Sequence, residues 1–261
     1  MNVLTVAGLL ARIPPAWASA AASAASPLAA VLSPQRRLAW EENVDASAAA
    51  RPSGFFAARK PFYHHLLLLY ESLAMLGGRR FRIVVEGEEH LREALARRCG
   101  LLVATAHVGN WHIGARLLHE RTGRPVHSVA GIQMSRAWTG GLRLAYRRHG
   151  IRVHPIRGAT RRFVRVLRGG GVVGLHIDGN LHAGAGPATR GIVLLARRSG
   201  VPILPGVCER TAPGELTARF WPLLEGGSSA REVTRLDDLL LDFVRGRAEQ
   251  WSLFRPLWGA R

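Results

Sequence analysis

The spacing of apolar positions changes near residue 80. Beyond it, short apolar runs alternate with segments whose apolar residues recur every three or four positions. The apolar runs predict strands at 81–85, 101–106, 126–130, 151–155, 172–177 and 202–208, and an edge strand at 217–220. The intervening segments predict helices at 88–98, 111–120, 136–149, 160–168, 189–199 and 229–245. Because these strands are apolar on both faces, we expect an α/β fold with a mostly parallel central sheet flanked by helices.

The first 80 residues show no strand pattern. Residues 61–76 predict a helix, which begins at Pro61 and ends before two glycines. Residues 34–60 are polar, and we expect a linker with one short helix. Residues 1–32 are apolar and rich in alanine and serine, but they contain no run of 18 apolar residues.

Two interpretations of residues 1–32 remain open. They form one or two helices that lie on a membrane interface, or a helical hairpin that packs on the rest of the protein. We take the first as the working prediction. The chain is then a helical, membrane-associating extension over residues 1–60 followed by an α/β domain over residues 61–261.

The net charge is strongly positive and comes almost entirely from arginine. Lysine and arginine total 36 against 18 acidic residues, a formal charge of +18, and Lys60 is the only lysine. A single lysine outside any glycine-rich loop argues against lysine nucleophiles and against a phosphate-binding P-loop. Arginine binds phosphate and carboxylate through two parallel hydrogen bonds, so an anionic partner is expected. An arginine-rich codon bias is the alternative explanation for part of the excess.

The arginines are concentrated in one part of the chain. Residues 121–177 contain 12 arginines and no aspartate or glutamate. A codon bias adds arginine but does not remove every carboxylate, so this stretch is predicted to bind anions. Arg147, Arg157 and Arg161 are candidates to bind a substrate phosphate; a solvated basic face is the alternative for each.

Cysteine and histidine spacing indicates no metal site. Cys99 and Cys208 are isolated, which fits a reducing compartment without disulfides. His176 and His182 flank Asp178, but their spacing matches no known set of metal ligands. We expect neither a bound metal nor a bound cofactor.

The segment from Thr105 to Gly114 contains the strongest candidate chemistry. An apolar strand runs directly into His107, and a glycine and Asn110 then lead into a helix. Active sites of open α/β sheets lie at such strand ends, and histidine there is suited to general-base catalysis. Asn110 is a plausible helix cap, and Trp111 is suited to the core or to substrate contact.

This segment resembles a known family motif. His107-Val108-Gly109-Asn110-Trp111-His112 is similar to the His-x4-acid motif of the lysophospholipid acyltransferase superfamily. The similarity is strongest to its late lipid A (lauroyl/myristoyl) acyltransferases and phosphatidylinositol mannoside acyltransferases, which read His-x-Gly-Asn-Trp followed by Glu or Asp. Further segments resemble this branch in the same order: Arg36-Arg37 with Asn43, residues 85–91, 167–178, 191–205 and 249–258.

The resemblance implies transfer of a fatty acyl group from a thioester, on coenzyme A or acyl carrier protein, to a hydroxyl of a lipid or glycolipid. His107 would act as general base, and Asn110 and Trp111 would contact substrate. The implied partners are a membrane lipid surface, the acyl donor and the lipid acceptor, with no nucleic acid. The implied location is the cytoplasmic face of the cell membrane, as a peripheral or monotopic protein.

The chain departs from the family at position 112, where a histidine replaces the acid. Three interpretations follow. Asp178, at the end of another predicted strand, orients His107; or His112 does so by hydrogen bonding alone; or catalysis is lost and binding is kept. A turn aspartate is the alternative for Asp178. The departure also leaves open a nonlipid acceptor in a specialised pathway.

Overall fold

The computed structural model describes residues 2–47, 59–129, 136–178, 187–225 and 230–255. Within them, seven strands form one sheet in the order β1-β7-β6-β2-β5-β3-β4. β6 and β7 are antiparallel, and the other neighbouring pairs are parallel. The strands are β1 (Arg82–Glu86), β2 (Leu101–Thr105), β3 (Val126–Val129), β4 (Ile151–His154), β5 (Val172–His176), β6 (Ile203–Ala212) and β7 (Glu215–Phe220).

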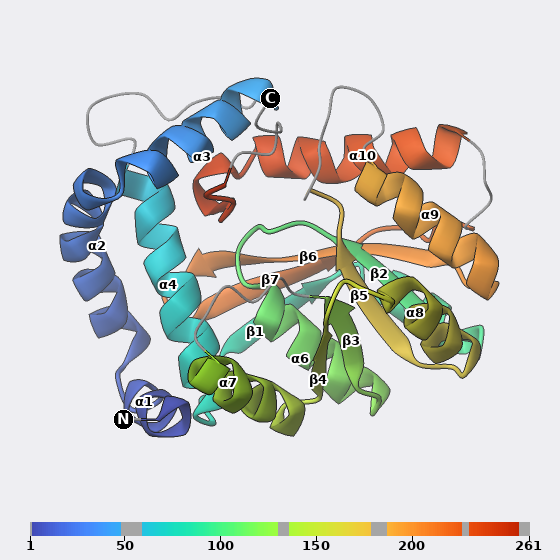
Figure 1. Cartoon of the computed structure of the whole chain (residues 1–261), viewed down its shortest axis with the longest axis horizontal. Coiled ribbons are helices and arrows are strands. Elements are labelled where there is room, and N and C mark those ends of the chain that lie inside the picture. The colour runs from blue at the N-terminus through green and yellow to red at the C-terminus, as the bar shows by residue number, and fades with distance from the viewer. Residues whose placement is uncertain (1, 48–58, 130–135, 179–186, 226–229, 256–261) are drawn as a thin grey trace.

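Helices cover both faces of this sheet, as the pattern of apolar strands predicts (Figure 1). They are α1 (Val3–Leu10), α2 (Pro15–Leu32), α3 (Pro34–Ala46), α4 (Arg59–Leu76), α5 (Glu88–Ala96), α6 (Trp111–Thr122), α7 (Arg136–Arg148), α8 (Ala159–Arg168), α9 (Pro187–Ser199) and α10 (Ala230–Arg245), with a 3-10 turn η2 (Ala248–Gln250). The chain therefore has the expected α/β fold, with a mostly parallel sheet and helices at its N-terminus.

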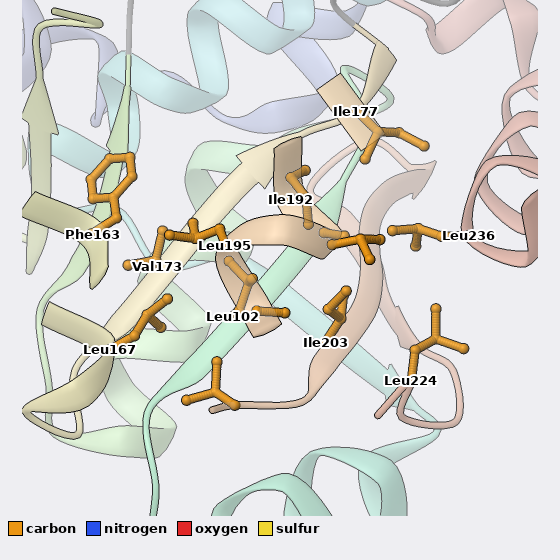
Figure 2. Packing of buried hydrophobic residues seen from close by; sticks show 14 of the residues in the cluster. Leu102, Phe163, Leu167, Val173, Ile177, Ile192, Leu195, Ile203, Leu224 and Leu236 are labelled. Atoms are coloured by element: carbon orange, nitrogen blue, oxygen red, sulfur yellow. The ribbon is translucent and has the colours of Figure 1, made fainter. Parts of the chain in front are cut away.

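β2 has a buried core on each side. Leu102 and Ala104 pack toward α8, α9 and α10, whereas Leu101 and Val103 pack toward α5 and α6. Figure 2 shows the first of these cores, with Phe163, Leu167, Ile192, Leu195 and Leu236 around the strands. Successive residues of a strand point to opposite faces, so a central strand covered on both sides must be apolar throughout.

One sequence-based expectation was wrong. Residues 217–220 belong to β7, which is not an edge strand, because β6 continues to Ala212 and a tight turn returns the chain beside it, so that β1 pairs with the far side of β7. Residues 34–46 form the 13-residue helix α3, which lies within the polar segment 34–60 and is longer than the short helix expected there. One side of α3 is buried, at Ala39, Trp40, Asn43 and Val44, and most of its other positions are polar, with Leu38 exposed.

α1 and α2 pack against α4 at one end of the molecule (Figure 1). Alanines of α2, Ala18 and Ala22, contact Leu67 and Ala74 of α4, and small side chains allow this close approach. Among the described residues, no single helix is long and apolar enough to cross a bilayer; α1 and α2 reach that size only together, and they are bent by 108°. The packing of both helices on α4 fits the second interpretation of residues 1–32, although α1 and α2 do not pair with each other as a hairpin does. The membrane-interface interpretation and the domain boundary at residue 60 stay predictions.

Candidate active site

The loop that carries His107 is fixed from two sides. The Ser252 amide donates a hydrogen bond to the His107 carbonyl (2.9 Å), and the Asn110 amide donates one to the Cys208 carbonyl (2.7 Å). Gly109 has φ +64°, and a Cβ there would lie 2.2 Å from the Cys208 carbonyl oxygen. Glycine is therefore required for the close contact between this loop and β6.

The register of two parallel strands brings His107 and Asp178 together. Thr105 at the end of β2 lies opposite His176 at the end of β5, and His107 and Asp178 follow them by two positions each. His107 Nδ1 lies 2.8 Å from Asp178 Oδ1, and the His107 amide donates to Oδ2 at 2.7 Å. The carboxyl ends of parallel strands thus place a base and a carboxylate side by side, although they are far apart in sequence.

Asp178 is held as a carboxylate. Trp251 Nε1 donates a third hydrogen bond to Oδ2 at 2.8 Å, and Asp178 is only 1% exposed. Burial by itself raises the pKa of Asp178, but the charge of His107 and the hydrogen bonds from it outweigh burial, so the pKa lies well below its ordinary value. A carboxylate at Nδ1 places the proton of neutral His107 on that nitrogen and leaves Nε2 as a proton acceptor.

His112 does not take the place of the missing family acid. It lies in the first turn of α6, where its ring stacks on Tyr146 with centroids 5.1 Å apart. Burial and the charge of His107 lower the pKa of His112 to about 4, so it is neutral near pH 7. Its hydrogen-bond partner is the Tyr146 hydroxyl, at a long 3.5 Å, whereas His107 bonds to Asp178.

Aromatic rings surround His107. The ring of His176 stacks on it with centroids 3.9 Å apart, and Trp111 meets it edge to face at 4.9 Å. Burial, followed by the charge of His107, moves the pKa of His176 well below its ordinary value. Its Nε2 has no hydrogen-bond partner among the described residues. A neutral ring therefore lies flat against His107 and fixes the plane of the imidazole.

Asn110 anchors the loop that carries His107 through buried hydrogen bonds. Its side chain is fully buried, accepts from the Ile113 amide as the cap of α6, and donates to Glu71 at 3.0 Å. Glu71 forms a buried two-contact ion pair with Arg210, both at 2.6 Å. Gln250 exchanges two hydrogen bonds with the Arg210 backbone. Asn110 therefore holds the loop in place and does not line the cavity.

Sequence reasoning did not assign roles to several of these residues. Gln250 and Trp251 lie in the C-terminal segment that resembles the family, and that resemblance was a usable signal. Glu71 gave a weaker one: it is the one charged residue of the apolar run 66–76, and a buried charge requires a partner. Which partner it has depends on tertiary packing.

A cavity of about 730 Å³ opens beside His107. Strands β2 to β7 and helices α6, α8 and α9 supply its walls, which also include Trp111, His112 and His176. Most lining residues are apolar, among them Leu118, Ile156, Phe163, Leu175, Ile192 and Leu195. The cavity is therefore suited to an apolar ligand, and His107 lies in its wall.

The three predicted phosphate-binding arginines lie elsewhere. Arg147, Arg157 and Arg161 are exposed on α7, on the segment after β4 and on α8, and none of them lines the cavity. Arg255 lines it instead.

Within the described part of the chain, no group of three or more His, Cys, Asp or Glu residues is arranged to hold a metal. His182 lies outside the described residues.

A family model and a solved structure are similar to this chain. Residues 78–259 match the family model of bacterial lipid A biosynthesis acyltransferases. Among solved structures, the chain is similar to the 1-acyl-sn-glycerophosphate (LPA) acyltransferase PlsC from Thermotoga maritima, with 14% identity and a TM-score of 0.46 over 92% of this chain and 100% of the other. A sequence search of curated proteins gives no match.

Proposed function

This chain belongs to the family of bacterial lipid A biosynthesis acyltransferases, and we propose that it moves a fatty acyl group from a thioester to a hydroxyl of a lipid or glycolipid. The family establishes an acyltransferase. The donor, the general base and membrane association are parts of our proposal. The observation that carries it is the pair of His107 and Asp178 at an apolar cavity.

The reaction needs a base and no covalent enzyme intermediate. His107 Nε2 removes the proton of the acceptor hydroxyl while Asp178 stabilises the imidazolium that forms. The acceptor oxygen forms a bond to the thioester carbonyl carbon, and the carbon–sulfur bond then breaks. The departing thiolate takes the proton back from His107, which returns the enzyme to its starting state. The stacked, neutral His176 favours this cycle because it places no second positive charge beside the imidazolium.

We test this proposal with purified protein, a labelled long-chain acyl-CoA or acyl carrier protein, and membrane lipids that include lipid A precursors. Wild type should form labelled lipid, and His107→Ala should form none above background. Equal product from both would refute the role of His107. A parallel set of soluble alcohols and amines tests the alternative of a nonlipid acceptor.

The proposed location is the cytoplasmic face of the membrane, with α2 and the start of α3 against lipid. Trp17, Leu28, Val31, Leu32 and Leu38 support it, because each is between 51 and 73% exposed. Exposed Arg36 lies between Leu32 and Leu38 in the chain and would attract anionic headgroups.

Flotation with anionic phospholipid vesicles tests this surface. Val31→Asn with Leu32→Asn should weaken binding, whereas Leu194→Asn, an exposed leucine on α9, should not. Unchanged binding of the double variant would contradict the proposed location.

A further inference from the structure

One residue gives the cavity a permanent charge. Among the described residues that line it, Arg255 alone is an arginine, lysine, aspartate or glutamate. Arg255 is exposed, and its side chain makes no hydrogen bond or ion pair within the described ranges. The cavity thus combines apolar walls, a base at His107 and one unneutralised guanidinium.

The chain holds Arg255 in place through an unusual contact. Asn43, fully buried on α3, donates from Nδ2 to the Leu253 carbonyl at 3.0 Å and to the Arg255 carbonyl at 2.9 Å. Two donors on one amide group therefore bind two carbonyls of the same tail. A buried side chain that satisfies two backbone carbonyls fixes their position.

The neighbouring residues fix the rest of this tail. Phe254 packs against Phe62 and His65 with centroids 5.0 and 4.9 Å apart, and the Arg36 guanidinium lies 5.3 Å from its ring. Four residues before Arg255, Trp251 donates to Asp178. The tail from Trp251 to Arg255 thus connects the Asp178 carboxylate to the cavity wall, and α3 and α4 hold the end of the tail at Phe254 and Arg255.

We propose that Arg255 binds a phosphate group of the substrate that fills this cavity, and that Asn43 is its positioning residue. This inference rests on the proposed acyl transfer and adds the residue that recognises the substrate's anion. A guanidinium fork matches two phosphate oxygens, and the absence of carboxylates among the described lining residues leaves its charge free to act. The phosphate belongs either to the coenzyme A or phosphopantetheine arm of the donor, or to the headgroup of an anionic lipid acceptor.

The experiment compares Arg255→Ala and Arg255→Lys with wild type, and with Arg92→Ala, which removes an exposed arginine on α5 away from the cavity. Each is assayed with acyl-CoA, with the phosphate-free thioester of N-acetylcysteamine, and with an acceptor lipid before and after dephosphorylation. Loss of a charge-assisted contact should raise KM about 10- to 100-fold for the substrate that carries the recognised phosphate. Arg255→Lys should recover part of this loss.

The assay arms separate the two sources of phosphate. If Arg255 binds the donor, KM rises for acyl-CoA and stays unchanged for the N-acetylcysteamine thioester. If it binds the acceptor, KM rises for the phosphorylated lipid and not for the dephosphorylated one. Unchanged KM values for all substrates, or a fall in kcat alone, would overturn the assignment.

Asn43→Asp tests the positioning role, because it keeps the size of the side chain but replaces both donors with acceptors. It should raise the same KM as Arg255→Ala, and the double variant should be no worse than Arg255→Ala alone. Additive losses would refute the link. Thermal unfolding of Asn43→Asp shows whether the chain still folds. If it does not, Asn43→Gln, which keeps both donors on a longer side chain, should raise the same KM less than Arg255→Ala does, and an equal or larger rise would refute the link.

Binding measurements keep this inference separate from the proposed function. Titration calorimetry of coenzyme A, and of vesicles with and without phosphorylated acceptor lipid, is done on His107→Ala with and without Arg255→Ala. A wild-type protein that transfers no acyl group refutes the proposed function, whereas Arg255-independent affinity for both ligands refutes the phosphate site.

Discussion

Replacing Asp178 by asparagine tests the proposed pair of His107 and Asp178 most directly, because asparagine has the same shape and lacks the charge. Asp178 Oδ2 accepts from the His107 amide and from Trp251 Nε1, and Oδ1 faces His107 Nδ1 at 2.8 Å. The single oxygen of asparagine is expected to stay on the two fixed donors. Its NH₂ group then faces Nδ1, which must accept a hydrogen bond and cannot carry the proton.

The expected loss follows from this change of tautomer. With Nδ1 unprotonated, neutral His107 carries its proton on Nε2, and the atom that should remove the hydroxyl proton becomes a donor. In the serine-protease triad the equivalent change lowers kcat on the order of 10⁴-fold. That factor corresponds to about 5.4 kcal/mol of activation free energy. We expect Asp178→Asn to lower kcat by about 10³- to 10⁴-fold.

The assay is single-turnover transfer of a labelled acyl group, with substrate binding measured separately. Asp242→Asn on α10, whose carboxylate binds Arg245 at the surface, is the matched control and should behave as wild type. Circular dichroism and thermal unfolding should show that both variants fold. A folded Asp178→Asn protein within about tenfold of wild-type kcat would refute the pair and favour an orienting role for His112.

Three further predictions concern the groups around this pair. Trp251→Phe removes one donor to Asp178 and should lower kcat roughly tenfold with little change in KM, as steady-state kinetics would show. Glu71→Gln leaves Arg210 as an uncompensated buried charge and should lower the free energy of unfolding by about 3–5 kcal/mol; a loss below about 1 kcal/mol in urea titration would contradict the role of this ion pair. Acidification should destabilise the fold. Burial, as the largest cause, lowers the pKa of three histidines from 6.5 to between about 3 and 4. Below pH 6.5 the unfolded chain therefore binds protons that the folded chain does not. Each should lower the free energy of unfolding by up to about 2 kcal/mol between pH 7 and pH 5, and equal stability at the two pH values would refute the neutral state of these histidines. The histidines are His64, His65 and His112.

The periodicity of the sequence was sufficient to predict most of the fold. Strands apolar on both faces, each followed by a helix, leave few alternatives to a covered parallel sheet. The local motif also placed His107 at a strand end and Asn110 at a helix start, since both depend on residues next to each other in the chain. The wrong expectation, for β7, concerns neighbours rather than local structure, because it depends on which strand lies beside β7.

The residue that faces His107 was decided only by the tertiary structure. Sequence left Asp178 and His112 as alternatives, and His112 is much the closer in the chain. A helix turns about 100° per residue, which directs His112 onto Tyr146, whereas the parallel register of β2 and β5 brings Asp178 opposite His107. The same holds for Arg255 and Asn43, which are 212 residues apart and in contact. Local patterns set which elements form, but strand register and helix packing decide which side chains meet, because those contacts join segments that no short stretch of sequence connects.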